Sequence, residues 1–407
     1  MRAICFLMTG CLALLAGMAQ AADLGIVGVK IYPSPTAAPI ADAVILIHDG
    51  LIVQIGRRGR TPIPAGYTVL DRTGDIVTAG FWNSHVHLIA PQLLDPNSSS
   101  AALSHVLQSM FTRWGFTTVF DLASTMETAN AIRSQVDAGR VDGPHVLTVG
   151  APFYPHSGTP VYAIDIYRKY HLPSAEIQSI PQAVARVDQQ AQQGANGIKL
   201  FTGAIVNGDI GVLVMPADQV RAIADEAHRQ GLPVFAHTSD KAGLDVAVDN
   251  GVDIIAHIAP LAGPWGPDFI ARLKARHIAL IPTLTLFVVE PDSSTSIDVG
   301  LQQVKAQAES GGDILFGTDA GFMEVYDTTQ EYQLMGRVLD WRAILASLTT
   351  TPARRFGQAG QAGRVETGLR ADLVVLDGDP AKDVANFAKV RDVIQSGRLI
   401  YDRVRPN

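Results

Sequence analysis

The sequence predicts an α/β protein that combines a (β/α)8 TIM barrel with a small β-sandwich built from both ends of the chain. Between residues 79 and 362, short apolar runs alternate with helical stretches, a pattern typical of parallel βαβ units. The flanking residues 22–78 and 363–407 are rich in strand-like runs and turns. No G-x-G-x-x-G segment follows an early strand, so the alternative fold, a doubly wound dinucleotide-binding sheet, is unsupported.

Eight apolar runs in the central region are predicted to be the barrel strands. They begin near Phe81, Thr117, His145, Gly197, Val234, Asp253, Ile278 and Asp313. Helices are expected between them, among others at residues 101–114, 182–193, 217–230 and 341–349. In the flanking regions, His48-Asp49-Gly50 and Ser396-Gly397 predict hairpin turns. The two ends are therefore expected to build one small sandwich together.

The first 21 residues are predicted to be a signal peptide. Arg2 provides a positive charge, residues 4–18 are apolar, and Ala19-Gln20-Ala21 matches a cleavage site. The apolar run is shorter than the ~20 residues of a spanning helix, which favours cleavage over a membrane anchor. Lipidation at Cys11 is a further alternative. We expect a periplasmic or secreted protein that meets the membrane only during export.

Composition narrows the kinds of partner and ligand. The 407 residues have a net charge of −7 and no long basic run, so nucleic acid is not an expected partner. The two cysteines, Cys5 and Cys11, both lie inside the predicted signal peptide. The mature chain would then lack disulfides, thiolate nucleophiles and cysteine-ligated metals. A small-molecule substrate and a homo-oligomeric state are expected.

Six side chains that can bind a metal fall at or near the C-terminal ends of predicted barrel strands. In a TIM barrel these strand ends converge on one active-site mouth. Core packing does not readily explain six such residues at one point, so the pattern predicts a hydrolase with one or two metal ions. The six residues are His85, His87, Lys199, His237, His257 and Asp319.

The residue types indicate which metal and which ligand chemistry. His85 and His87 are two residues apart on a strand and so share a face. Imidazole and carboxylate ligands without a thiolate fit Zn²⁺ best, with Mn²⁺, Co²⁺ or Fe²⁺ as alternatives. Beside divalent cations the pKa of Lys199 should fall. The neutral amine could then add CO₂, and the resulting carbamate could bridge two metals.

Residues after the predicted strands are candidates for binding substrate. His156 lies in a tyrosine-rich loop after the third strand, where it could polarise a substrate carbonyl or stabilise an oxyanion. The predicted substrate-contacting residues are Tyr154, His156, Trp265, Phe287 and Tyr326. Simple loop packing is an equally good explanation for each of them taken alone.

These residues resemble the motif set of the amidohydrolase superfamily. The segment from Thr78 to His87 is similar to its "PG-x-[ILV]-D-x-H-x-H" entry motif, with Ala79 for Pro and Asn83 for Asp. Gly317-Thr318-Asp319 resembles its "GTD" segment, and 368–374 resembles its closing "G-x-x-ADLV" strand. The chain is most similar to the imidazolonepropionase-like branch, with its Xaa-Pro dipeptidases and ochratoxinase-type amidases.

That resemblance covers nearly all of the predicted mature chain and implies a carboxylated Lys199 that bridges two metal ions. The chain departs from the dipeptidases after the third strand, where Tyr154-Pro155-His156-Ser157-Gly158 replaces a Gly-Gly-His-Gly-like loop.

The predicted function is hydrolysis of C–N bonds in an amide or dipeptide by a metal-dependent enzyme. A metal-bridging hydroxide would attack the carbonyl, and Asp319 would carry the proton to the leaving nitrogen. Two alternatives remain open: a lactone or phosphotriester hydrolase that uses the same centre, and a metal-binding protein without turnover. The predicted cofactor is a pair of Zn²⁺ ions.

Overall fold

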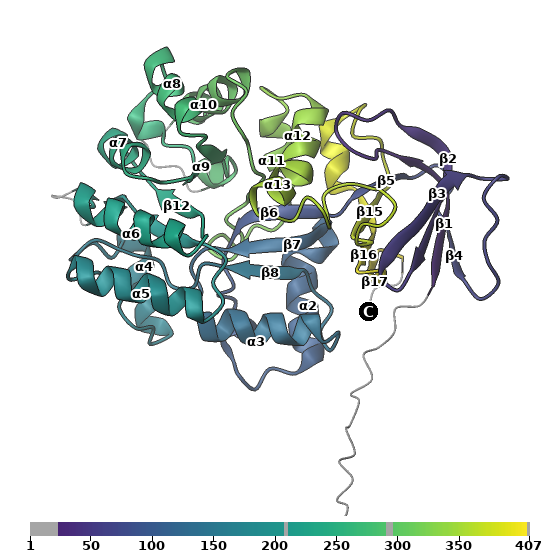
Figure 1. Cartoon of the computed structure of the whole chain (residues 1–407), viewed down its shortest axis with the longest axis horizontal. Coiled ribbons are helices and arrows are strands. Elements are labelled where there is room, and N and C mark those ends of the chain that lie inside the picture. Colours follow the sequence, from purple (N-terminus) through teal and green to yellow (C-terminus); the bar gives the residue numbers. More distant parts are fainter. Residues whose placement is uncertain (1–22, 207–210, 290–295, 405–407) are drawn as a thin grey trace, which may run out of the picture.

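The computed structural model describes residues 23–206, 211–289 and 296–404. The predicted signal peptide, residues 1–21, lies outside the described residues. A β-rich part made from both ends of the chain lies beside an α/β part that contains the central region (Figure 1). No helix in the described ranges is long and apolar enough to cross a membrane.

The two ends of the chain pair in one eight-stranded sheet, which places the N- and C-terminal strands together as predicted. The order is β17-β16-β15-β5-β1-β2-β3, and β4 pairs with β1. The strands from the two ends belong to one hydrogen-bonded sheet. Their predicted arrangement as a sandwich of two layers therefore stays a prediction. The strands are β1 (Leu24–Ile31), β2 (Ile40–His48), β3 (Leu51–Arg57), β4 (Thr68–Asp71), β5 (Ile76–Ala79), β15 (Leu373–Leu376), β16 (Val390–Gln395) and β17 (Arg398–Asp402).

The central region contains seven parallel strands in two sheets, of order β6-β7-β8 and β14-β13-β12-β9. A short hairpin, β10 (Gly203–Ile205) and β11 (Val212–Val214), follows β9. The parallel strands are β6 (Phe81–Val86), β7 (Phe116–Asp121), β8 (His145–Thr148), β9 (Ile198–Phe201), β12 (Val234–His237), β13 (Ile254–Ala256) and β14 (Ala279–Ile281).

Backbone hydrogen bonds connect the edges of these two sheets into a TIM-barrel-like arrangement. After β8, Phe153 donates to Lys199 O (2.8 Å) and accepts from Phe201 N (2.9 Å). The predicted eighth strand, which begins at Asp313, forms an isolated bridge to β14 rather than a regular strand. The same segment accepts a hydrogen bond from Ser84 of β6 (2.7 Å).

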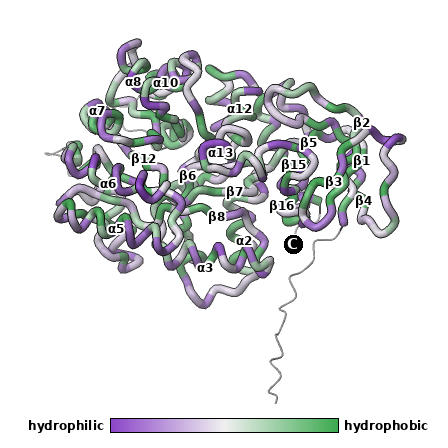
Figure 2. The backbone as a smooth tube through the Cα atoms, viewed as in Figure 1, coloured by the Kyte–Doolittle hydropathy of each residue, from purple (hydrophilic) through white to green (hydrophobic). Residues whose placement is uncertain are grey.

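Helices surround the parallel strands. Figure 2 shows that hydrophobic and hydrophilic residues alternate along these helices, as expected when one face packs on the strands. Ser99, Thr125, Ser179, Asp240 and Asp340 cap helix N-termini with their side chains. The α-helices are α1 (Pro91–Leu94), α2 (Ser100–Met110), α3 (Met126–Asp137), α4 (Val161–Lys169), α5 (Ile180–Gln192), α6 (Ala217–Arg229), α7 (Lys241–Asp249), α8 (Pro267–Ala275), α9 (Leu286–Val289), α10 (Ile297–Glu309), α11 (Thr329–Met335), α12 (Trp341–Leu348) and α13 (Thr350–Arg355).

Strand alternation decides which side chains face the barrel interior. In β9 and β12, Ile198, Leu200, Val234 and Ala236 pack in one cluster with residues of α5 and α6. The intervening residues of the same strands point to the opposite face, where Phe235 belongs to the interior cluster. Lys199 and His237 lie on this inner face by the same alternation.

Candidate metal centre and substrate cavity

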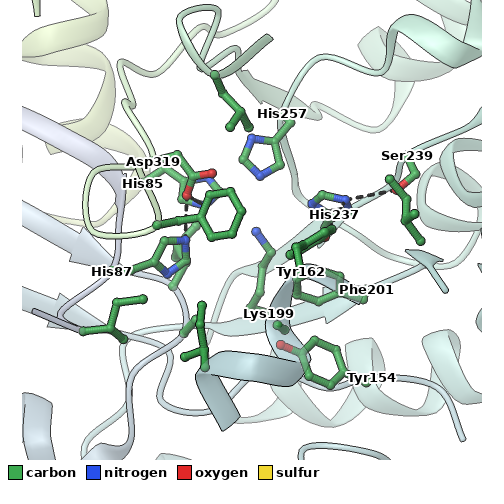
Figure 3. Close-up of a pocket in the computed structure, with 18 of the residues that line it drawn as sticks. His85, His87, Tyr154, Tyr162, Lys199, Phe201, His237, Ser239, His257 and Asp319 are labelled. Atoms are coloured by element: carbon green, nitrogen blue, oxygen red, sulfur yellow. Dashed lines mark hydrogen bonds and ion pairs between the residues drawn. The ribbon is translucent and has the colours of Figure 1, made fainter. Parts of the chain in front are cut away.

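All six predicted metal ligands line one cavity of about 290 Å³ at the C-terminal ends of the parallel strands (Figure 3). Lys199 comes from β9, His237 from β12, and His257 directly follows β13. His87 directly follows β6, which contains His85. The structure therefore brings together residues that lie as far apart in sequence as His85 and Asp319.

Asp319 lies beside both histidines of the first barrel strand. Its Oδ1 atom is 2.6 Å from His87 Nε2 and 3.2 Å from His85 Nε2. One ligand atom from each of these residues lies within 4.8 Å of the other two, close enough to surround one ion. The ring centroids continue from His85 to His257 at 4.4 Å and from His257 to His237 at 5.0 Å.

Two of the histidines have a hydroxyl partner on one ring nitrogen. His257 Nδ1 lies 2.6 Å from Thr283 Oγ1, and His237 Nε2 lies 3.0 Å from Ser239 Oγ. Such outer partners commonly fix the ring orientation of metal-ligating histidines. The other ring nitrogen of each residue is then available for a metal.

Lys199 occupies the centre of this group of side chains (Figure 3). It is buried, and its Nζ atom lies 5.6 Å from the ring centroid of Phe201. No hydrogen bond or ion pair of Lys199 Nζ occurs within the described parts of the chain. Burial lowers the pKa of Lys199 to about 7, against the attraction of Asp319, which acts in the opposite direction.

Burial favours the neutral form of three imidazoles in the cavity, those of His85, His237 and His257. Burial, together with Lys199, lowers the pKa of His85 and of His237 to about 3, and burial lowers the pKa of His257 well below its usual range. Neutral imidazole is the form that binds a metal.

The carboxylate in the cavity stays ionised. Burial alone would raise the pKa of Asp319, but His85 and His87 beside it hold that pKa well below its usual range. Imidazoles bind a metal in their neutral form, so an ionised carboxylate beside them gives the ligand set a negative charge that suits a divalent cation.

Unusual backbone conformations accompany these strand ends. Ser239, His257, Thr283 and Asp319 all have positive φ, at 52°, 151°, 45° and 60°, which only glycine adopts without cost. Each belongs to or directly contacts the candidate metal ligands. Strain of this kind gathers at functional sites because the surrounding structure holds a required side-chain direction.

Asn83 holds the turn that carries Asp319. Its amide donates to Thr318 Oγ1 (2.7 Å), and its Oδ1 accepts from Thr318 N (3.2 Å) and His85 N (3.3 Å). This residue replaces the aspartate of the superfamily motif. An amide can both donate to and accept from the Gly-Thr-Asp turn, whereas an ionised aspartate can only accept.

The donor set fits a divalent metal. Among the described residues, the buried Nδ1 atoms of His85 and His87 have no hydrogen-bond partner, and Asp319 Oδ1 faces His85 Nε2 at 3.2 Å without forming a hydrogen bond. Unsatisfied buried polar atoms are costly, and several in one cavity indicate a missing ligand. Four imidazoles, a carboxylate and a lysine are the ligands expected around Zn²⁺ or a similar ion.

The predicted substrate-contacting residues divide into two groups. Tyr154 and Phe287 line the cavity. His156 is exposed on the loop after β8, Trp265 packs against Phe269 at 5.2 Å, and Tyr326 is half-buried against the core cluster around α11. These three residues do not line the cavity, although neighbours in the same loops, such as Leu261 and Phe322, do.

Several lining residues escaped the sequence analysis. Tyr162 lies on α4 with its hydroxyl 3.3 Å from His237 Nε2, and Tyr167 and Ile166 on the same helix also line the cavity. The signal was the amphipathic spacing of Tyr162 and Ile166 within a tyrosine-rich segment. Ser239, two residues after His237, could have been found by extending each strand end into its loop.

Asp121 was also missed, although it ends β7 in the same way as the candidate ligands end other strands. It is buried, and it accepts from Leu88 N (3.1 Å), Ser124 Oγ (2.7 Å) and Thr148 Oγ1 (2.6 Å). The hydrogen bond to Leu88 fixes the chain directly after His87. Asp121 is therefore a positioning residue and not a lining residue.

Fold and cavity together define a TIM-barrel-like protein with a metal-binding group of side chains at its strand ends. The chain belongs to the amidohydrolase family, whose model matches residues 76–400. It lies in the superfamily branch that contains imidazolonepropionases and dipeptidases, and it is an enzyme that hydrolyses C–N bonds of small molecules. The predicted superfamily and class of enzyme are confirmed.

Named relatives span nearly the whole chain. Ochratoxinase of Aspergillus niger is 24% identical over 408 residues, covering 89% of this chain and 83% of the relative. Imidazolonepropionase of Porphyromonas gingivalis is 22% identical over 401 residues, covering 88% and 89%. A crystal structure of a Xaa-Pro dipeptidase with bound methionine superposes with a TM-score of 0.77 at 21% identity, covering 93% of this chain and 100% of the other.

Proposed function

We propose that this enzyme hydrolyses amide-type C–N bonds with divalent metal held by His85, His87, His237, His257 and Asp319, and with Lys199 as a carbamate ligand. The observation that carries the proposal is the convergence of these side chains on one cavity, where several of their buried donor atoms have no partner in the described residues. A divalent metal in such a site supplies Lewis acidity that polarises a carbonyl and generates a nucleophile from water at neutral pH.

The chain's own residues supply proton transfer and orientation. Asp319 stays ionised and faces the cavity, so it can take a proton from the attacking water and deliver it to the nitrogen as the C–N bond breaks. The products are then a carboxylic acid and an amine. The Tyr162 hydroxyl, close to His237, can orient the substrate carbonyl by a hydrogen bond.

The carbamate proposal for Lys199 rests on its position. Its Nζ atom lies among the histidines and Asp319, and no fixed partner in the described chain holds it there (Figure 3). Addition of CO₂ to the amine releases one proton and places two oxygen ligands at this position. A carbamate could bridge two ions, so metal and carbamate should depend on each other.

The test is metal analysis together with a substrate panel. We expect two ions in each wild-type chain, and loss of at least one ion and nearly all turnover in Lys199→Ala and Lys199→Arg, since a guanidinium stays charged. His228 is an exposed histidine of α6, and His228→Ala serves as the control. This variant should keep its metal ions and its turnover. Two occupied metals in Lys199→Ala would refute the bridge. Turnover of lactones or phosphotriesters without turnover of any amide would refute the assigned reaction.

We also propose that the enzyme is exported after cleavage behind Ala21. The support is the sequence of the first 21 residues alone. Intact-mass analysis of periplasmic or secreted protein should show a chain that begins at Ala22. A retained N-terminus, or a diacylglycerol mass on Cys11, would contradict export by simple cleavage.

A further inference from the structure

The walls of the cavity above the candidate ligands are almost entirely apolar. Apart from the six candidate ligands, its lining contains three tyrosines, Ser239 and fourteen side chains without a polar group. Leu122 lines it after β7, Leu172 after α4, Ile205 in β10, and Leu286 and Phe287 in α9. The apolar surface therefore comes from several separate segments and surrounds the site.

The few polar groups of the wall are uncharged hydroxyls, and each lies in contact with another group of the protein. The Ser239 hydroxyl donates to Gly203 O (2.8 Å) and also contacts His237, as does the Tyr162 hydroxyl. The hydroxyls of Tyr154 and Tyr167 share a hydrogen bond with each other. Figure 3 shows Tyr154, Tyr162 and Phe201 gathered on one side of Lys199.

The described lining offers no cation for a substrate carboxylate except Lys199. Under the proposed function, on which this inference rests, Lys199 is a metal ligand and cannot serve that purpose. Segments 207–210 and 290–295, which lie outside the described residues, contain neither lysine nor arginine in their sequence and carry three acidic residues. The N-terminus of α9 is also occupied, since Glu331 accepts from Leu284 N (2.9 Å) and Thr285 N (2.7 Å).

Large exposed apolar residues continue this character around the cavity. Five of the ten in the described chain belong to the segments that line it: Val161 and Ile164 on α4, Leu261 after β13, Val289 on α9 and Val325 shortly after the lining residue Phe322. An apolar lining with an apolar surround indicates a ligand that is apolar over most of its length.

We propose that the substrates are neutral amides with apolar groups on both the acyl and the amine side of the scissile bond, and not dipeptides or N-acyl amino acids with a free carboxylate. An ionised carboxylate on the substrate loses its hydration against this wall, and the described wall offers it no lysine or arginine in return, which costs binding and turnover. Apolar groups on both sides gain the burial that the wall offers.

The test uses two compounds that differ by one carboxylate: N-benzoyl-2-phenylethylamine and N-benzoyl-L-phenylalanine. With the metal-loaded wild type, kcat/KM for the neutral amide should exceed that for the acid by at least about 100-fold. Binding of both compounds to Asp319→Asn, measured by calorimetry, should show the same preference without turnover. Equal or better binding of the acid, or binding of neither compound, overturns the inference.

These two readouts separate the inference from the proposed function. Preferential binding of the neutral amide without turnover of any C–N bond by the wild type would leave the substrate preference standing and refute the assigned reaction. Turnover of the acid at a rate equal to that of the amide would refute the preference and leave the reaction standing.

A charge added to the wall should change the preference. Leu261 lines the cavity and is 42% exposed, so Leu261→Lys can place an ammonium at the rim without burying it. We expect at least a tenfold rise in kcat/KM for the acid relative to the amide. Val325 is 39% exposed and does not line the cavity, so Val325→Lys is the matched control. It should change kcat/KM for neither the acid nor the amide. No rise in Leu261→Lys, or an equal rise in both variants, would contradict contact between the carboxylate and this wall.

Discussion

The terminal sheet and the cavity both bury charged groups, but they satisfy them differently. In the sheet, buried Asp392 pairs with Arg72 of the other chain end, and buried Asp372 contacts Arg370 and His145. Burial alone would raise the pKa of Asp372, but His145 and Arg370 outweigh it and lower that pKa to about 2. Each of these carboxylates has a cationic partner.

In the cavity, one carboxylate lies beside the imidazoles of His85 and His87, and several donor atoms have no partner within the described chain. In this molecule, the presence or absence of a partner separates buried polar groups with a structural role from those with a functional role. A matched buried charge needs no further ligand and ties elements together. An unmatched group is kept at a cost to stability, which indicates a bound species that the chain itself does not provide.

The largest expected effect is a loss of turnover when the carboxylate in the cavity is replaced. Asp319→Asn should lower kcat by 10²–10⁴-fold, since it removes proton transfer and a charged ligand. The metal-free variant should still fold, because asparagine has the same shape as aspartate and keeps one oxygen beside His85 and His87. The measurements are turnover on the best amide and thermal unfolding of metal-free protein. Near-wild-type turnover would remove Asp319 from the mechanism.

In the terminal sheet, by contrast, we expect a substitution to lower stability and to leave turnover unchanged. Arg72→Met should leave buried Asp392 without a partner and lower the free energy of unfolding by about 3 kcal/mol, with turnover per folded molecule unchanged. Arg58→Met removes the exposed pair with Asp42 and should cost less than about 1 kcal/mol. Chemical denaturation measures the free energy of unfolding of both variants. Equal effects of the two variants would mean that burial does not decide the strength of these pairs.

Glu331 provides an intermediate case, because dipoles rather than a cation satisfy its buried carboxyl group. Burial raises the pKa of Glu331 to about 7, although hydrogen bonds from Thr285 and Leu284 act in the opposite direction. The protonated form therefore favours the folded state, and its contribution is complete below pH 4.5 and lost as the pH rises through 7. This change amounts to at most about 3 kcal/mol.

The measurement is the free energy of unfolding of wild type and of Glu331→Gln from pH 4 to pH 8. The difference between the two proteins isolates the contribution of Glu331 from those of all other titratable groups. We expect the wild type to lose stability relative to Glu331→Gln as the pH rises. A constant difference across this range would mean that the three hydrogen bonds keep the carboxylate ionised throughout.

The smallest expected effect is on kcat/KM when the contact between Tyr162 of the cavity wall and the candidate ligand His237 is removed. Tyr162→Phe removes one hydroxyl that lies 3.3 Å from His237 and keeps the ring against Phe322. A lost hydrogen bond of this kind is worth about 1 kcal/mol, so kcat/KM should fall by about fivefold. Metal content should not change. Loss of metal in this variant would assign Tyr162 to the metal centre rather than to the wall.

The sequence by itself determined the strand ends, and with them the six candidate ligands. Parallel strands of a TIM barrel present their C-terminal ends at one face, so polar residues such as Lys199, His237 and Asp319 after apolar runs could be placed together before any contact was known. The pairing of the two chain ends was equally predictable, because both carry strand and turn patterns beside a βα centre.

Only the tertiary structure decided the rest. The loops after the strands have no periodicity, so nothing local distinguishes Tyr162, which reaches the cavity, from His156, which stays exposed. The positive φ of His257 and the hydrogen bonds of Asn83 depend on neighbours from other strands. The eighth predicted strand becomes an isolated bridge because the turn to Asp319 replaces a regular ladder. Strand ends follow from the local pattern, whereas the wall of the cavity depends on contacts between segments far apart in the chain.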